Sequence, residues 1–186
     1  MKTYDELVVL FENANGVFLR TERKLLTRKV AERTLCGALM LHIHDLIKED
    51  HSYDGYYTDV EYNRNQGGIK TTQKTILGPC ERIIRINCDL ILHSRGEYTE
   101  QDNLIAIEMK KATRPMAEKR ADRERLVALT KEYFTDAAEW NHVLPEHVCR
   151  YVLGVYYEID YRKKNILIEY YHSGVLVSSH NCSFEG

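Results

Sequence analysis

The chain has 186 residues, of which 44% are apolar and 29% are charged, and its formal net charge is −2. This length and composition are typical of one globular domain that folds around its own core. They exclude a globally basic nucleic-acid binder. They also exclude a helical membrane protein, because the apolar runs stay well short of the ~18 residues that a span requires.

Acidic residues follow the first methionine closely (MKTYDE), and no clean apolar stretch comes after them. This pattern argues against a signal peptide, so we expect a cytoplasmic protein with no membrane partner. The five cysteines are Cys36, Cys80, Cys88, Cys149 and Cys182. They are widely spaced and form no C-x-x-C pair, which favours reduced, mostly buried thiols over disulfides or a zinc site.

The first predicted elements are two helices. Thr3 and Glu6 fit a capping box, and the helix that they begin is expected to run to about Ala14, where Asn15-Gly16 would stop it. A longer helix is predicted over about residues 22–48, because apolar residues recur there at helical spacing.

Strands are predicted over residues 56–64, 81–93 and 103–111, followed by a helix over 117–134 and strands over 151–161 and 166–172. Residues 174–186 are expected to form a tail with a short strand and a loose end. The order predicts an α/β (α+β) fold in which helices flank a mixed central β-sheet. We expect one domain over 1–186, in which residues 1–20 form an N-terminal helix and loop.

Two predicted strands each carry an acid where a strand interior favours an apolar side chain. These are Asp89 in INCDL (86–90) and Glu108 in IAIEMK (105–110). Because strand side chains alternate between faces, Glu108 and Lys110 must point the same way. If the two strands are hairpin neighbours, Asp89 and Glu108 can lie across from each other, about 5 Å apart.

Two carboxylates that close need a shared proton or cation. A divalent ion is the simplest solution, and oxygen ligands suit Mg²⁺ or Mn²⁺. Lys110 would then orient a metal-bound water or stabilise charge on a phosphate. The alternative is an ordinary salt pair on an edge strand, because the E-x-K pattern is common by itself.

Three further acids are candidates for the site. Glu32 lies within an apolar helical stripe, so its carboxylate needs either the same metal or a buried salt bridge to an arginine such as Arg85. Asp122 shows the same pattern on the later helix, where we favour a structural pairing with a lysine or arginine over the alternative of a role in organising the active site. Glu61 is either an additional acid near the metal, with Arg64 as a phosphate contact, or part of a solvated strand face.

Basic residues gather in two stretches, 20–33 and 110–125. Their members are Arg20, Arg23, Lys24, Arg28, Lys29 and Arg33, and then Lys110, Lys111, Arg114, Lys119, Arg120, Arg123 and Arg125. Local basic surface beside an acidic site suits an enzyme that holds both phosphates and cations. Two solvated helix faces are the alternative.

The order of these features resembles the PD-(D/E)XK nuclease superfamily over about residues 25–172. The matching features are Glu32 on a helix, Asp89 on a strand and Glu108-Met109-Lys110 on the next strand, followed by a helix and further strands. Cys88 stands where the motif has proline. The resemblance implies a restriction-endonuclease-like fold and hydrolysis of phosphodiester bonds with Mg²⁺ (or Mn²⁺).

By this resemblance, the catalytic residues would be Glu32, Asp89, Glu108 and Lys110. The metal ligands would be Asp89, Glu108, the carbonyl of Met109 and Glu32. DNA is expected as substrate ahead of RNA, in restriction, phage defence or repair, and cleavage of both strands would favour a homodimer. A catalytically silent nucleic-acid-binding or protein-interaction module with the same fold is the alternative.

Overall fold

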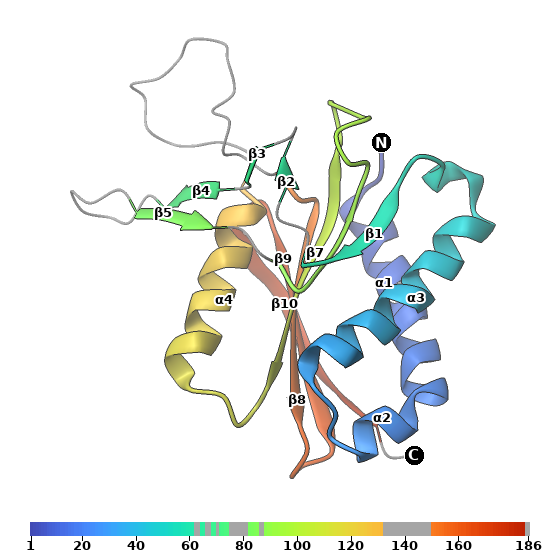
Figure 1. The fold of residues 1–186 in the computed structure, drawn as a ribbon, viewed down its shortest axis with the longest axis vertical. Helices are drawn as coiled ribbons and strands as arrows, with labels where there is room; N and C mark the ends of the chain where they lie inside the picture. Colours follow the sequence, from blue (N-terminus) through green and yellow to red (C-terminus); the bar gives the residue numbers. More distant parts are fainter. Residues whose placement is uncertain are drawn as a thin grey trace.

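In a computed structural model, the chain forms a mixed α/β fold built on a six-stranded sheet (Figure 1). The structure describes residues 1–61, 88–131 and 150–184, and between the first two of these ranges the backbone of four short strands. The strand order is β1-β6-β7-β8-β9-β10. Only the β7–β8 pair is parallel in this sheet, and its other neighbours are antiparallel.

The strands of the sheet are β1 (Tyr57–Val60), β6 (Leu90–His93), β7 (Asn103–Lys111), β8 (Leu153–Asp160), β9 (Asn165–His172) and β10 (Val175–Ser183). The four short strands form two separate antiparallel pairs. These are β2 (Arg64–Asn65) with β3 (Gly68–Ile69), and β4 (Thr71–Lys74) with β5 (Arg82–Arg85).

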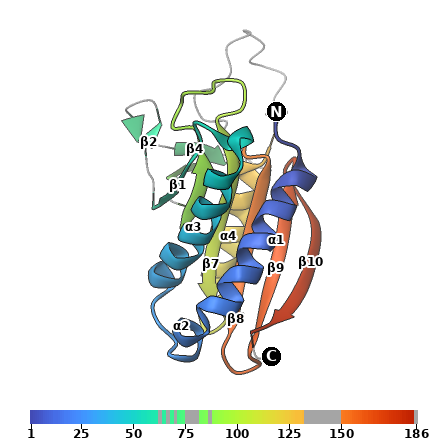
Figure 2. The ribbon, with the colours of Figure 1, turned by 90° about the vertical axis from the view of Figure 1, so that its right-hand side faces the viewer.

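Helices cover both faces of the sheet (Figures 1 and 2). The first face is covered by α1 (Tyr4–Thr21), α2 (Arg23–Thr27) and α3 (Glu32–Glu49), which enclose the larger core with the inward side chains of the sheet. The opposite face is covered by α4 (Met116–Leu129), which forms a smaller apolar cluster with β6 to β9. A short 3₁₀ helix, His51–Tyr53, follows α3.

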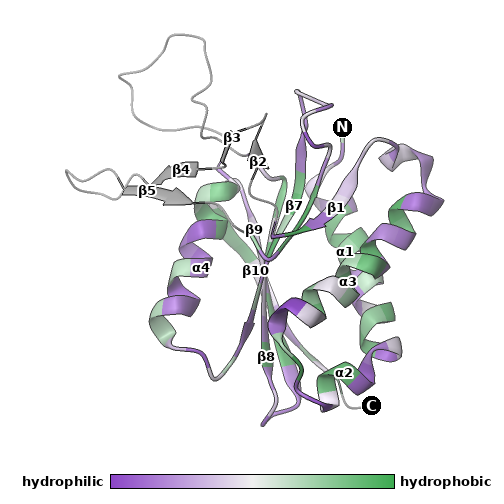
Figure 3. Ribbon diagram, in the orientation of Figure 1, coloured by the Kyte–Doolittle hydropathy of each residue, from purple (hydrophilic) through white to green (hydrophobic). Residues whose placement is uncertain are grey.

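The apolar part of the α4 interface is confined to one end of the helix. Leu126 and Leu129 contact the smaller cluster, whereas the buried residues of the preceding turns are Lys119 and Asp122. Figure 3 accordingly shows more hydrophilic residues along α4 than along α1. Polar side chains therefore hold much of α4 to the sheet, and Glu108 and Lys110 of the predicted site contact this helix through Arg125 and Asp122.

The capping box at Thr3 and Glu6 is confirmed, but the predicted end of the first helix is wrong. The helix α1 continues through Asn15-Gly16 to Thr21. Asn15 is buried and its Oδ1 accepts a 2.8 Å hydrogen bond from the hydroxyl of Tyr157. Tertiary contacts of the later turns, including buried Phe18, therefore outweigh the local stop signal.

The long helix predicted over 22–48 is divided in two. The break follows α2, where Lys29 has a φ of +54°, and α3 begins at Glu32. Glu32 is thus the first residue of a helix, where a carboxylate is favoured by the helix dipole, and does not lie in mid-helix as the stripe predicted.

The single strand predicted over 81–93 is also wrong in part. β5 belongs to a separate pair, and the strand of the main sheet begins only at Leu90. Asp89 therefore lies immediately before the first residue of β6 and is not within the strand. The strand predicted over 56–64 ends earlier, at Val60, because Glu61 adopts a φ of +50°.

The later elements follow the prediction more closely. β7 has the predicted bounds, and β8 and β9 form a hairpin over the predicted polar turn. The tail is more regular than expected, because β10 is a nine-residue edge strand paired with β9. The helix α4 ends at Leu129, and the last predicted residues, 132–134, lie outside the described residues.

Cys36 and Cys88 are buried, Cys182 is partly buried, and all three are free thiols, as predicted. Cys80 and Cys149 lie outside the described residues. Across the described ranges, no helix has the length and apolar character needed to cross a bilayer.

Candidate active site

The candidate site forms where β7 runs past the end of β6. The two strands are antiparallel and Leu90, the first residue of β6, lies opposite Ile107. The next residues of β7 therefore extend beyond β6, and side chains reach their backbone from this side. Asp89 Oδ2 accepts a 2.8 Å hydrogen bond from the Met109 N–H. Glu32 Oε1 accepts an equally short bond, also 2.8 Å, from the Lys111 N–H.

The backbone geometry also places the Met109 carbonyl on this side. In a strand, the N–H and C=O of one residue point to the same neighbouring strand. Since the Met109 N–H points to Asp89, its carbonyl faces the same open edge, where Asp89 and Glu32 approach. The resemblance predicted this carbonyl as a metal ligand, and its direction is compatible with that role.

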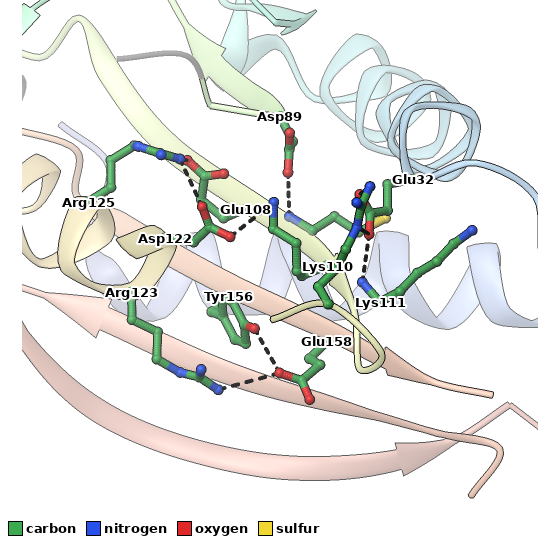
Figure 4. A network of polar contacts seen from close by, with 12 residues as sticks. Glu32, Asp89, Glu108, Lys110, Lys111, Asp122, Arg123, Arg125, Tyr156 and Glu158 are labelled. Carbon is green, nitrogen blue, oxygen red and sulfur yellow. Dashed lines mark hydrogen bonds and ion pairs between the residues drawn. The ribbon is translucent and has the colours of Figure 1, made fainter. Parts of the chain in front are cut away.

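Glu108 and Lys110 lie on the face of β7 that α4 covers (Figure 4). Glu108 is 1% exposed, and its Oε1 lies 2.6 Å from Nη1 of Arg125 on α4. The same Nη1 lies 3.2 Å from Oδ1 of Asp122. The ammonium of Lys110 lies 3.1 Å from the other carboxylate oxygen of Asp122. Two acids and two bases thus alternate in one buried chain of contacts between β7 and α4.

The electrostatics of these groups follow from burial. Burial, with the nearby carboxylates Asp89 and Asp122 adding to it, raises the pKa of Glu108 to about 8 although Arg125 opposes the shift. Burial also raises the pKa of Asp89, against the hydrogen bond from Met109. Burial alone would lower the pKa of Lys110, but Asp122 and the other carboxylates raise it, so that Lys110 stays cationic.

Glu32 lies farther along the same strand edge. Arg114 contacts both of its carboxylate oxygens, at 3.3 and 3.2 Å, while Oε1 also receives the Lys111 N–H. Burial alone would raise the pKa of Glu32, but these contacts lower it. The predicted salt bridge to an arginine is therefore present with Arg114, while the side chain of Arg85 lies outside the described residues.

Four residues named from the sequence therefore meet around β7: Asp89, Glu108, Lys110 and, at its end, Glu32. The expected structural pairing of Asp122 is confirmed by its contacts with Lys110 and Arg125. The N–H of Glu61 donates a 3.3 Å hydrogen bond to the carbonyl of Asp89, but the Glu61 carboxylate forms an exposed ion pair with Arg33 at 2.6 Å. The side chain of Arg64 lies outside the described residues.

Sequence reasoning missed the contact of Arg125 with Glu108. Arg125 was one of several basic residues in its stretch, and the only local signal was its i, i+3 spacing from Asp122 on the helix. Within 1–61, 88–131 and 150–184, no three His, Cys, Asp or Glu side chains are grouped so as to hold a metal ion. The carboxylates of Asp89 and Glu108 turn instead to the Met109 N–H and to Arg125.

The donor set nevertheless fits a hard divalent cation. It consists of carboxylate oxygens and one backbone carbonyl, which Mg²⁺ and Mn²⁺ prefer. A cationic group already bridges two of the acids, because one guanidinium nitrogen of Arg125 contacts both Glu108 and Asp122. The positive charge of Arg125 thus stabilises the cluster of acidic side chains formed by Glu108 and Asp122.

A second ionic network continues along the α4 face over β8 and β9 (Figure 4). Lys119 lies 3.2 Å from Glu158, and Arg123 lies 2.7 Å from Glu169. The Arg123 guanidinium also stacks 3.9 Å from the centre of the Tyr156 ring. Much of the basic stretch 110–125 therefore balances buried acids, and Arg120, with a side chain 76% exposed, faces solvent.

The whole chain was compared with models of protein families, with curated proteins and with solved structures, and none of the three comparisons found a match.

Proposed function

We propose that the protein is a metal-dependent nuclease of the PD-(D/E)XK type, with a restriction-endonuclease-like arrangement of the sheet and helices. It would hydrolyse phosphodiester bonds, with DNA as the first substrate to test. One observation carries the proposal: the buried carboxyl group of Glu108 and the partly buried one of Asp89, both of raised pKa, lie with a cationic lysine where β7 extends beyond β6. Perturbed ionisable groups gathered in this way are typical of functional sites.

In this proposal Asp89, Glu108 and the Met109 carbonyl hold Mg²⁺ or Mn²⁺, and Glu32 assists from the start of α3. A bound divalent ion would polarise the phosphate and lower the pKa of a water. Lys110 would orient that water or stabilise charge on the phosphate, which its cationic state permits. Lys110 would act on the face of β7 that it shares with Glu108.

The surroundings of the site support a polyanionic substrate. Arg114, whose side chain is 50% exposed, is paired with Glu32. Lys111 is the last residue of β7. Lys29 is exposed at the turn before α3, and its carbonyl accepts a hydrogen bond from the Lys111 ammonium. These cations would contact phosphates, which positions a nucleic acid without reading its sequence.

A catalytically silent module is the second candidate, and the ion pairs favour it. Glu108 is paired with Arg125 at 2.6 Å, and Glu32 is paired with Arg114. If these pairs are purely structural, the acids never bind a metal, and the protein would bind nucleic acid or another protein without cutting.

The decisive experiment incubates purified protein with plasmid, linear duplex, single-stranded DNA and RNA, in Mg²⁺, Mn²⁺ or EDTA. Glu108→Ala and Lys110→Ala are compared with exposed controls of the same type, Glu49→Ala and Lys163→Ala. The nuclease predicts metal-dependent cleavage that the two site variants lose and the controls keep. Folded wild-type protein that cuts none of the substrates would favour the silent module.

A further inference from the structure

The position of Arg125 has a consequence for how the proposed site is regulated. Its Nη1 lies 2.6 Å from Glu108 and 3.2 Å from Asp122, so that one positive group joins two buried carboxylates. The contact with Glu108 is a short charge-assisted hydrogen bond, and the contact with Asp122 is a longer one. A divalent cation bound to Glu108 would have to approach the same oxygen.

Asp122 is placed to take part in this exchange. Its side chain is 6% exposed, and among the described residues its Oδ2 accepts no hydrogen bond, although the Lys110 ammonium lies 3.1 Å away. One carboxylate oxygen is therefore held by Arg125, and the other lies near a cation without hydrogen-bonding alignment. A buried carboxylate satisfied to this extent gains from a stronger cation.

Arg125 contacts both acids through a single nitrogen, Nη1. Its Nε is buried and has no hydrogen-bond partner within the described part of the chain, whereas the side chain as a whole is 21% exposed. A long, partly exposed arginine side chain on a helix can therefore move its guanidinium toward solvent. The buried acids cannot make the corresponding movement, because Glu108 is fixed on a central strand of the sheet.

We propose that Arg125 is an internal competitor for the divalent cation, which it excludes from Glu108 and Asp122 until the cation displaces it. This inference rests on the proposed function for its biological meaning, but the exchange itself concerns only metal binding. It implies a metal-free protein that is folded, in which Arg125 contacts both Glu108 and Asp122 and excludes the cation. It also implies weaker metal affinity than the same carboxylates would have without Arg125.

The test compares Mn²⁺ binding by calorimetry in wild type, Arg125→Met and Arg120→Met. Arg120 is the matched control, because it lies on the same helix and carries the same charge, but its side chain is 76% exposed and lies 3.9 Å from Glu124. We expect Arg125→Met to bind Mn²⁺ about tenfold more tightly than wild type, since a charge-assisted competitor is gone. Arg120→Met should bind as wild type does. Equal or weaker binding by Arg125→Met, or an equal gain in the control, would overturn the proposal.

A second measurement covers the case in which Arg125→Met does not fold. In wild-type protein, the side-chain Nε–H signal of Arg125 is followed by nuclear magnetic resonance during titration with Mg²⁺. We expect a saturable change at Arg125 and none at Arg120. Metal binding with no change at Arg125 would refute the exchange, as would the absence of any binding in every variant.

The outcomes for this proposal and for the nuclease are separable. Tighter metal binding by Arg125→Met, without cleavage of any nucleic acid, would support the exchange and reject the nuclease. Metal-dependent cleavage by wild type, with no gain in affinity on removing Arg125, would do the reverse.

Discussion

Replacing Glu108 with glutamine should stabilise the metal-free protein at neutral pH. The pKa of Glu108 in the folded protein is about 8, well above the 4.5 of an unperturbed glutamate. At a pH between these two pKa values, the unfolded chain has released the proton that Glu108 still holds in the folded protein. The free energy of unfolding therefore falls as the pH rises. At pH 7 the cost is about 3 kcal/mol, at about 1.4 kcal/mol per pH unit.

Glutamine has the shape of the protonated acid and avoids this cost. It also keeps an oxygen that can accept the hydrogen bond from Arg125, while Asp122 still balances the guanidinium charge. Glu108→Gln should therefore unfold like wild type near pH 4 and be about 3 kcal/mol more stable at pH 7, which raises the melting temperature by roughly 6–12 °C.

The measurement is denaturant unfolding in EDTA at about five pH values between pH 4 and about pH 8.5, which gives the dependence of the unfolding free energy on pH. Glu49→Gln, an exposed substitution of the same type, should follow wild type throughout. The reasoning fails if Glu108→Gln is less stable than wild type at pH 7. That result would mean that the ionised pair with Arg125 is a net structural contact, for which removal of one partner costs about 3–5 kcal/mol.

Three further predictions concern separate parts of the chain. Lys110→Met should lower metal-dependent cleavage at least about 100-fold, measured on plasmid DNA, while the rise in melting temperature on adding Mn²⁺ persists. Thr3→Ala should cost about 1 kcal/mol in denaturant unfolding, because it removes the capping box with Glu6. Gly174→Ala should cost about 1–2 kcal/mol by the same assay, because Gly174 has a φ of +78° and the new Cβ would lie 2.8 Å from Cγ of Lys131. An unchanged midpoint in either stability variant would contradict its reasoning.

The parts of the fold that depend on the alternation of apolar and polar residues along a strand could be predicted from the sequence. The strand β7 matches its predicted bounds because Ile105, Ile107 and Met109 face one core while Glu108 faces α4. That pattern has a single interpretation, since a slip of one residue would bury Lys110 in the larger core. The face shared by Glu108 and Lys110 could be predicted for the same reason.

The parts that tertiary contacts decide could not be predicted. Asn15-Gly16 is a local stop signal, but a hydroxyl 142 residues away satisfies Asn15 within the helix. A continuous strand was predicted over 81–93, because apolar alternation persists through the point at which the chain enters the main sheet at β6. No local pattern records which strand a residue pairs with.

The site shows the same division between local pattern and distant partner. An acid in an apolar stripe indicates that a positive partner is needed, and this held for Glu32 and Asp122. The identity of the partner depends on how α4 crosses the sheet, so Arg125 could not be distinguished in advance from its basic neighbours. The difference matters because a metal and an arginine satisfy the same requirement. The sequence pattern that predicts a cation at Glu108 is therefore compatible with a nuclease and with a silent module, and metal binding in the presence and absence of Arg125 separates the two.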